Sequence, residues 1–272
     1  MSQNVTVAAE GAAVYWQVGR TSRSMLNGWK AAGFDLMIPK PRTPKALLAD
    51  AMGHIYDRRD LLVRPLAKKS AFTVVREIRG QHENDYPQVA TAEVNETGDV
   101  TATENQMAIQ ATYDELASVL PGSSVTASLV KIVQALLGVS LRDAGGIYWL
   151  PPQALAKWAT VAAVAEAGAV DGDTKMYTMR TVMDAETIRA VRDGVVAEMN
   201  TAVARILEEI NGGTLGERAL ETKQAECMTL KRRLAEYETI LGQTLAEVTE
   251  SIAQANDAAL HAILAAGAEM SV

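Results

Sequence analysis

The sequence predicts an α+β fold that is predominantly helical, with a small antiparallel sheet near the N-terminus and a C-terminal long helical hairpin or coiled-coil arm. Three observations lead to this prediction. Apolar residues recur every three or four positions over residues 184–266, which is the period of an amphipathic helix. Over residues 61–103 the period falls to two, as in strands. Residues 145–180 then read as strand, helix and strand.

Composition indicates a folded protein in the cytoplasm. The chain has 272 residues, of which 48% are hydrophobic, so it can bury a sizeable core. It contains neither a run of eighteen apolar residues nor the pattern of a signal peptide, so we expect no membrane association. The one cysteine, Cys227, lies on an apolar helical stripe, where we expect a buried thiol.

The net charge of −7 is unevenly distributed along the chain. Residues 1–82 carry thirteen Lys and Arg against six Asp and Glu, whereas residues 83–120 carry eight acids and no base. Two interpretations follow: the basic segment faces acidic parts of the same chain, or it binds an anionic partner.

The N-terminal region, residues 1–110, is expected to contain a strand at residues 14–18 and a short helix ending near Gly33. Thr43 followed by Pro44 is a typical helix start, and an apolar face continues to Ile55. The strands of an antiparallel meander are expected next, with one face on that helix, and residues 101–110 are expected to be a connector. The four strand ranges are 61–66, 72–78, 88–94 and 100–103.

The middle region, residues 111–183, is expected to hold two helices and a small crossover unit. The helices are residues 113–120 and 124–137, and the unit is a strand at 145–150, a helix at 153–167 and a strand at 176–180. Trp149 and Trp158 are expected in the core; the alternative is an exposed aromatic and proline surface for a partner.

The arm, residues 184–272, is predicted to be two helices. The first has its apolar stripe from Ile188 to Ile210, and residues 211–213 break it. Thr214 and Glu217 form a capping box that would start the second helix. The first stripe would close the protein's own core. The distal stripe is harder to cover internally and is the predicted partner surface: Leu230, Leu234, Tyr237, Leu241, Leu245, Val248 and Ile252.

Several short motifs resemble an uncharacterised family of bacterial and phage proteins. They are Tyr15-Trp16, the segments at residues 41–47 and 64–66, the segment at 145–151, and the segment at 216–221. The resemblance spans most of the chain. It implies a bacterial or mobile-element setting and no catalytic residue.

Residues that commonly carry chemistry are sparse, and we predict no catalytic, cofactor-binding or metal-binding residue. None of the three histidines is spaced from another as two ligands on one helix face would be. His82, Glu83 and Asp85 allow a weak metal site, but a polar turn explains them better. The pairs Gly145-Gly146 and Gly212-Gly213 lack the strand, turn and helix order of a phosphate loop, so we attribute them to turns. Asp171, Asp173 and Asp184 read as turn and cap residues.

The basic residues near the N-terminus form the candidate nucleic-acid-binding set, provided that they converge on one face. They are Lys40, Arg42, Lys45, Arg58, Arg59, Arg64, Lys68, Lys69, Arg76 and Arg79.

Three functions therefore stay open. The first is a non-enzymatic interaction or assembly protein that forms a homo-oligomer or binds a protein partner through its C-terminal helices. The second is a nucleic-acid-binding protein of a phage or mobile element. The third is an unrecognised enzyme, which a deep pocket with clustered carboxylates would indicate.

Overall fold

The computed structural model describes residues 11–67, 70–80, 84–142 and 145–269. It confirms the α+β class with predominant helix. The chain forms two compact units. Unit 1 comprises the described parts of Met1–Gln17, Leu129–Ala162 and Lys175–Val272, and unit 2 comprises Val18–Ser128 and Ala163–Thr174. The units are discontinuous in sequence, whereas the sequence analysis divides the chain into three consecutive regions.

Unit 1 contains a four-stranded sheet in the order β10-β11-β1-β12. Its strands are β1 (Gly11–Gln17), β10 (Val139–Ser140), β11 (Tyr148–Leu150) and β12 (Lys175–Thr181). Strand β1 is antiparallel to both β11 and β12, so those two run parallel to each other. A 3-10 turn, η2 (Pro152–Ala154), and helix α5 (Leu155–Ala167) connect them. The predicted strand, helix and strand are therefore confirmed, but the N-terminal strand lies between the two.

Tryptophan side chains anchor this sheet. Trp158 is 1% exposed, and its indole N–H donates to the Thr178 hydroxyl at 3.1 Å. Trp149 is fully buried and donates to Thr181 at 3.2 Å. The Trp16 ring lies 5.7 Å from that of Trp158. The predicted core role of Trp149 and Trp158 is confirmed, and an exposed aromatic surface at these residues is excluded.

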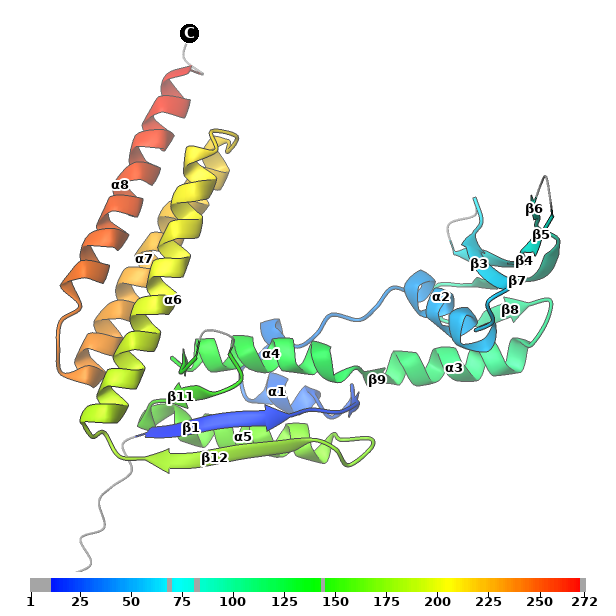
Figure 1. Ribbon diagram of the computed structural model, residues 1–272, viewed down its shortest axis with the longest axis horizontal. Coiled ribbons are helices and arrows are strands. Elements are labelled where there is room, and N and C mark those ends of the chain that lie inside the picture. Colours follow the sequence, from blue (N-terminus) through cyan, green and yellow to red (C-terminus); the bar gives the residue numbers. More distant parts are fainter. Residues whose placement is uncertain (1–10, 68–69, 81–83, 143–144, 270–272) are drawn as a thin grey trace, which may run out of the picture. The chain divides into compact units, whose positions relative to one another are not determined.

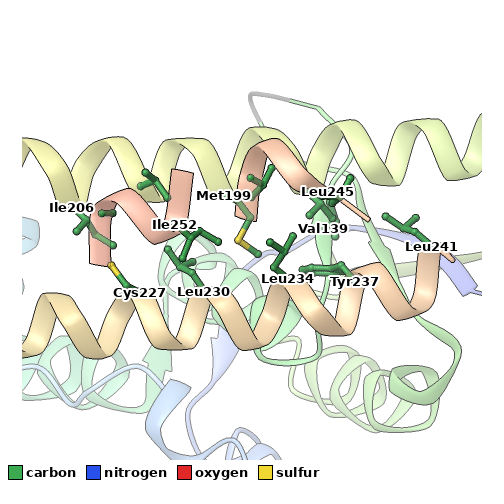
Figure 2. Packing of buried hydrophobic residues seen from close by; sticks show 14 of the residues in the cluster. Val139, Met199, Ile206, Cys227, Leu230, Leu234, Tyr237, Leu241, Leu245 and Ile252 are labelled. Carbon is green, nitrogen blue, oxygen red and sulfur yellow. The ribbon is translucent and has the colours of Figure 1, made fainter. Parts of the chain in front are cut away.

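The C-terminal arm is a bundle of three helices, not a pair (Figure 1). They are α6 (Ala185–Asn211), α7 (Glu217–Leu241) and α8 (Ala246–Glu269). The predicted second helix ends at Leu241 because Gly242 adopts the left-handed conformation, with φ of 65°, as its C-cap. The chain then turns back, and α8 packs against both other helices. Figure 2 shows the apolar side chains that meet between them.

The helix starts in the arm agree only in part with the sequence prediction. Asp184 caps α6 by accepting a hydrogen bond from the Thr187 backbone N–H at 2.8 Å, as expected. The prediction that Thr214 and Glu217 form a capping box is wrong. Helix α7 begins at Glu217 itself, and its N-cap is Gly216, which makes no side-chain cap hydrogen bond.

Unit 2 contains the predicted antiparallel meander. Its strands β3 (Leu61–Pro65), β4 (Ala71–Arg76), β7 (Gln88–Val94) and β8 (Val100–Ala102) follow one another in the sheet. A core cluster joins this sheet to α2 (Pro44–Ile55) and to α3 (Gln106–Ser118). Thr43 caps α2 by accepting from the Ala46 backbone N–H, which confirms that helix start. Helix α3 begins inside the stretch that the sequence analysis treats as a connector.

The remaining elements of unit 2 are short. Strand β2 (Thr21–Ser22) pairs with β9 (Val119–Leu120), and β5 (Ile78–Arg79) pairs with β6 (Asn84–Asp85). Helix α1 (Asn27–Ala31) and a 3-10 turn η1 (Asp35–Met37) precede α2. The longer helix α4 (Gly122–Ala135) follows β9, and its residues from Leu129 onward belong to unit 1. Arg20 bonds Asp171 at 2.9 Å and Glu115 at 2.6 Å, so it ties three distant segments of this unit together.

Candidate functional site

The predicted partner surface on the distal stripe lies inside the bundle. Its seven side chains are at most 9% exposed and belong to one core cluster with residues of α6 and α8. They are therefore covered internally, because the turn at Gly242 folds α8 onto α7. This corrects the expectation of an exposed stripe. The corrected residues are Leu230, Leu234, Tyr237, Leu241, Leu245, Val248 and Ile252.

An open cleft lies on another side of the same helices, within unit 1. Its volume is about 1070 Å³. Residues of α4, of the β10 region, of α6 and of α7 line it, and we call it the α6 cleft. A smaller groove of about 310 Å³ between α6 and α7 shares three residues with it and so extends it. The charged lining residues of the α6 cleft are Arg142, Arg189, Asp193, Glu198, Arg205 and Arg233, and the small lining residues used below are Ala190, Gly194, Ala197 and Thr201.

Small residues make α6 accessible on this side. Ala190, Gly194, Ala197 and Thr201 recur at steps of three and four, so they share one face of the helix. A Cβ atom on Gly194 would lie 2.4 Å from the Ser140 carbonyl oxygen. The β10 backbone therefore approaches α6 more closely than any residue larger than glycine at position 194 would allow. This backbone forms one wall of the cleft.

A partly buried arginine, Arg233, belongs to the wall contributed by α7. The Arg233 side chain is 20% exposed, and its Nη2 donates to Glu198 at 2.9 Å and to the Tyr237 hydroxyl at 3.2 Å. Its Nε is buried and has no acceptor in the part of the chain that the structure describes. Burial raises the pKa of Tyr237 to about 12, even though the Arg233 charge acts in the opposite direction. The phenol is therefore neutral at ordinary pH and can accept from Arg233.

Three more arginines line the cleft. Arg189 pairs with Glu186 one turn earlier, and Arg205 pairs with Glu226 of α7 at 3.2 Å. For the exposed Arg142, no carboxylate partner is found among the described residues. Guanidinium groups bind carboxylates in a two-pronged geometry, and surface ion pairs such as that of Arg189 exchange partners at low cost. The α6 cleft can therefore accept a chain segment that carries acidic side chains.

The apolar stripes in the sequence do not point to this site. The signal was present on the other face of α6, where small residues at helical spacing lie between Arg189 and Arg205. Arg233 is not among the site residues predicted from the sequence either. That arginine stands four residues before Tyr237, a spacing that brings side chains together on a helix.

The predicted nucleic-acid-binding residues are divided between the two ends of α2. Lys40, Arg42 and Lys45 lie at its start, and Arg58 and Arg59 follow its end. A helix of this length spans about 18 Å, so the two groups are well separated. Three further arginines lie on the strands, and Lys68 and Lys69 lie outside the described residues. The strand arginines are Arg64 on β3, Arg76 on β4 and Arg79 on β5.

Several of these charges are already paired. Arg42 bonds Asp50, Arg76 lies 3.2 Å from Asp60, and Arg79 lies 3.2 Å from Glu77. The Lys45 ammonium lies 6.0 Å from the centre of the Phe72 ring. Among the described members, the exposed arginines for which no ion pair is found are Arg58, Arg59 and Arg64.

The other candidate residues have structural explanations where they are described. His82 and Glu83 lie outside the described residues, and Asp85 belongs to β6. In the described ranges, no group of three or more His, Cys, Asp and Glu is placed to hold a metal ion. Cys227 is fully buried as expected, and burial raises the pKa of its thiol. Gly145 and Gly146 have positive φ, which confirms their role in a turn.

The comparisons with known proteins identify a family but no function. Residues 11–268 match the sequence model of DUF6744, a family of unknown function. No curated protein and no solved structure matches the chain. In the portion that the structure describes, no helix combines the length and the apolar character needed to cross a membrane. The resemblance to an uncharacterised family is thereby confirmed.

Proposed function

The chain belongs to this family of unknown function, and we propose that it is a non-enzymatic interaction or assembly protein that holds an acidic segment of a protein partner in the α6 cleft. The observation that carries the proposal is the cleft itself, with its floor of small residues and its four arginines. The C-terminal helices thus take part in association, as the sequence analysis proposes, but through the outer face of α6 and not through the distal stripe.

The lining favours a polypeptide over a small molecule. The cleft follows α6 for about four turns, from Arg189 to Arg205, so its occupant is elongated. Alanine and threonine side chains on its floor leave space for a neighbouring backbone. The arginines beside it would bind carboxylates of the occupant in place of their present surface partners. A cytoplasmic location, expected from the sequence, is part of this proposal.

A titration with labelled glutamate-rich and lysine-rich peptides, followed by fluorescence anisotropy, tests the proposal. We expect the wild-type chain to bind the glutamate-rich peptide only. The double variant Arg142→Glu/Arg189→Glu should weaken this binding by at least about tenfold, because two attractive charges become repulsive. Arg232→Glu is the matched control, since Arg232 is exposed on α7 but does not line the cleft. No binding by the wild-type chain, or equal weakening by the control, would overturn the proposal.

A second proposal is nucleic-acid binding by unit 2, supported by the exposed Arg58 and Arg59 between α2 and β3. Titration of labelled single- and double-stranded DNA at two salt concentrations tests it. Binding that falls with salt and is lost in Arg58→Glu/Arg59→Glu would support it. Arg76→Glu is the control, because that charge already faces Asp60. Absence of binding at low salt would contradict this proposal and leave the first one untouched. The bacterial, phage or mobile-element setting expected from the sequence is part of both proposals.

A further inference from the structure

The groove that extends the α6 cleft lies between α6 and α7, and residues of both helices line it. No residue of α8, which is described over Ala246–Glu269, lines the groove or the cleft. Together the two hollows follow α6 from Arg189 to Ile206, a length of about 26 Å. Helices α6 and α7 therefore share an open surface that the third helix of the bundle leaves uncovered.

The floor of this surface consists of small side chains whose hydrogen-bond donors are already used. The exposed floor residues are Ala197 and Thr201 on α6 and Thr222, Ala225 and Thr229 on α7. Each threonine hydroxyl donates to the carbonyl oxygen four residues earlier in its own helix, at 2.8 to 3.0 Å. The backbone N–H groups of these residues are bonded inside the helices. The carbonyl groups of a neighbouring backbone would therefore find no donor on this floor.

Strand β10, the outer strand that borders the cleft, is no template for a further strand either. It has only two residues. Its Ser140 carbonyl oxygen lies so near α6 that a Cβ atom on Gly194 would be 2.4 Å from it. An extended segment that filled the cleft would therefore bury backbone N–H and C=O groups without partners, which is unfavourable.

An α-helix satisfies its backbone hydrogen bonds internally, so it can lie on a floor that offers none. We propose that the α6 cleft and its groove hold an amphipathic α-helix of the protein partner, packed along α6 and α7 as a fourth helix of the bundle. The small floor residues permit the close approach of another helix. This inference rests on the proposed function and specifies the conformation of the acidic segment.

The lining also specifies the side chains of the bound helix. Apolar residues at steps of three and four would face the floor, where Ala197 and Ala225 leave room for them. Acidic residues near its two ends would reach Arg189 at one end of the cleft and Arg205 at the other. Short isolated helices are marginally stable in water, and neighbouring glutamates weaken them. The segment would therefore become helical as it binds.

Two labelled peptides of equal charge test the conformation of the occupant. The first has about sixteen residues, with alanine and leucine along one helical face and glutamates beside them. The second has proline in place of two central alanines, which breaks the helix and leaves the charge unchanged. We expect the proline peptide to bind the full chain at least about tenfold more weakly in fluorescence anisotropy. Nuclear magnetic resonance of the isotope-labelled first peptide should show helical Cα chemical shifts only when the chain is present.

A pair of variants on α7 tests whether the peptide lies on the floor. Ala225→Trp fills the groove without changing a charge, so it should weaken binding of the first peptide by at least about tenfold. Ala235→Trp is the matched control, because Ala235 is also an exposed alanine of α7 but lines neither the groove nor the cleft. Its affinity for the peptide should equal that of the wild type.

The possible outcomes separate this inference from the proposed function. Equal affinity for the two peptides, an extended bound peptide, or unchanged binding by Ala225→Trp would overturn the helix and leave the proposed function standing. Binding of neither peptide would overturn both. Light scattering tests whether a second copy fills the cleft instead: a wild-type dimer that Ala225→Trp dissociates would overturn the partner helix in favour of self-association.

Discussion

At the residue scale, the buried phenol of Tyr237 is the clearest source of pH dependence. Tyrosine ordinarily has a pKa near 10, and in this fold burial raises it to about 12. Between these values the unfolded chain loses the proton while the folded chain keeps it. The folded state therefore loses stability as pH rises from about 10 to about 12, and its stability below about 10 is unaffected by this group.

We predict that replacing Tyr237 by phenylalanine removes this part of the alkaline instability. The wild-type free energy of unfolding should fall by roughly 3 kcal/mol more than that of Tyr237→Phe between pH of about 10 and about 12. Urea denaturation of both proteins at several pH values measures this difference in the free energy of unfolding. Tyr177→Phe is the control, because Tyr177 is 42% exposed. Parallel pH profiles for wild type and Tyr237→Phe would show that the phenol is not held neutral by the fold.

Gly194 is the second residue with a specific structural demand. A Cβ atom there would meet the Ser140 carbonyl oxygen at 2.4 Å and a Val139 methyl at 2.6 Å. We predict that Gly194→Ala lowers the free energy of unfolding by about 1–3 kcal/mol, because the backbone must shift to admit the methyl group. Gly53→Ala in α2 should instead be neutral or stabilising, since nothing lies within 4 Å of its Cβ position. The midpoints of urea denaturation of the two variants are compared with that of the wild type. Equal shifts for Gly194→Ala and Gly53→Ala would contradict the close approach of the β10 backbone to Gly194.

At the element scale, one glycine decides that the arm has three helices. Gly242 adopts φ of 65°, which costs an L-residue with a side chain about 1–2 kcal/mol. We predict that Gly242→Ala destabilises the protein by about that amount, measured by thermal or urea unfolding. Gly216→Ala serves as the control because Gly216 has φ of −75° and an open Cβ position. An unchanged midpoint for Gly242→Ala would mean that the chain turns equally well without the left-handed residue.

Helix α3 shows how a tertiary contact starts an element that the pattern hides. Residues 101–110 are predicted to be a connector because they are polar and lack a clear period. In the structure α3 begins at Gln106, and Asn105 adopts the left-handed conformation just before it. The Asn105 amide donates to the Tyr56 hydroxyl at 3.2 Å, and Tyr56 follows α2. The helix start thus depends on a residue 49 positions away.

At the scale of the whole molecule, one continuous stretch of unit 2 has a core of its own. The buried residues of this core run from Leu47 to Tyr113 and join α2, the meander and α3. We predict that residues 41–118 fold in isolation. Calorimetry should show one cooperative transition with an enthalpy of roughly 50 kcal/mol, as expected for a domain of this size. A fragment that melts without a cooperative transition would show that this core needs the rest of the chain.

The sequence by itself determined the elements that depend on local physics. The meander strands, the Thr43 and Asp184 caps, the buried tryptophans and the amphipathic stripes all follow from periodicity and side-chain chemistry within a few residues. The same stripes could not say which surface covers them. A stripe on a two-helix arm has to be covered by another surface, whereas a stripe in a three-helix bundle is already covered.

Only the tertiary structure decided where distant segments meet. It placed β1 between β11 and β12, folded α8 back onto α7 so that the two halves of the distal stripe are buried, and left the small-residue face of α6 open beside Arg142 and Arg233. The physical reason is that the short connection between Leu241 and Ala246, which begins with the left-handed Gly242, determines whether a whole apolar face is inside or outside. Hydrophobic burial is not directional, so the pattern records that a face must be covered but not by what.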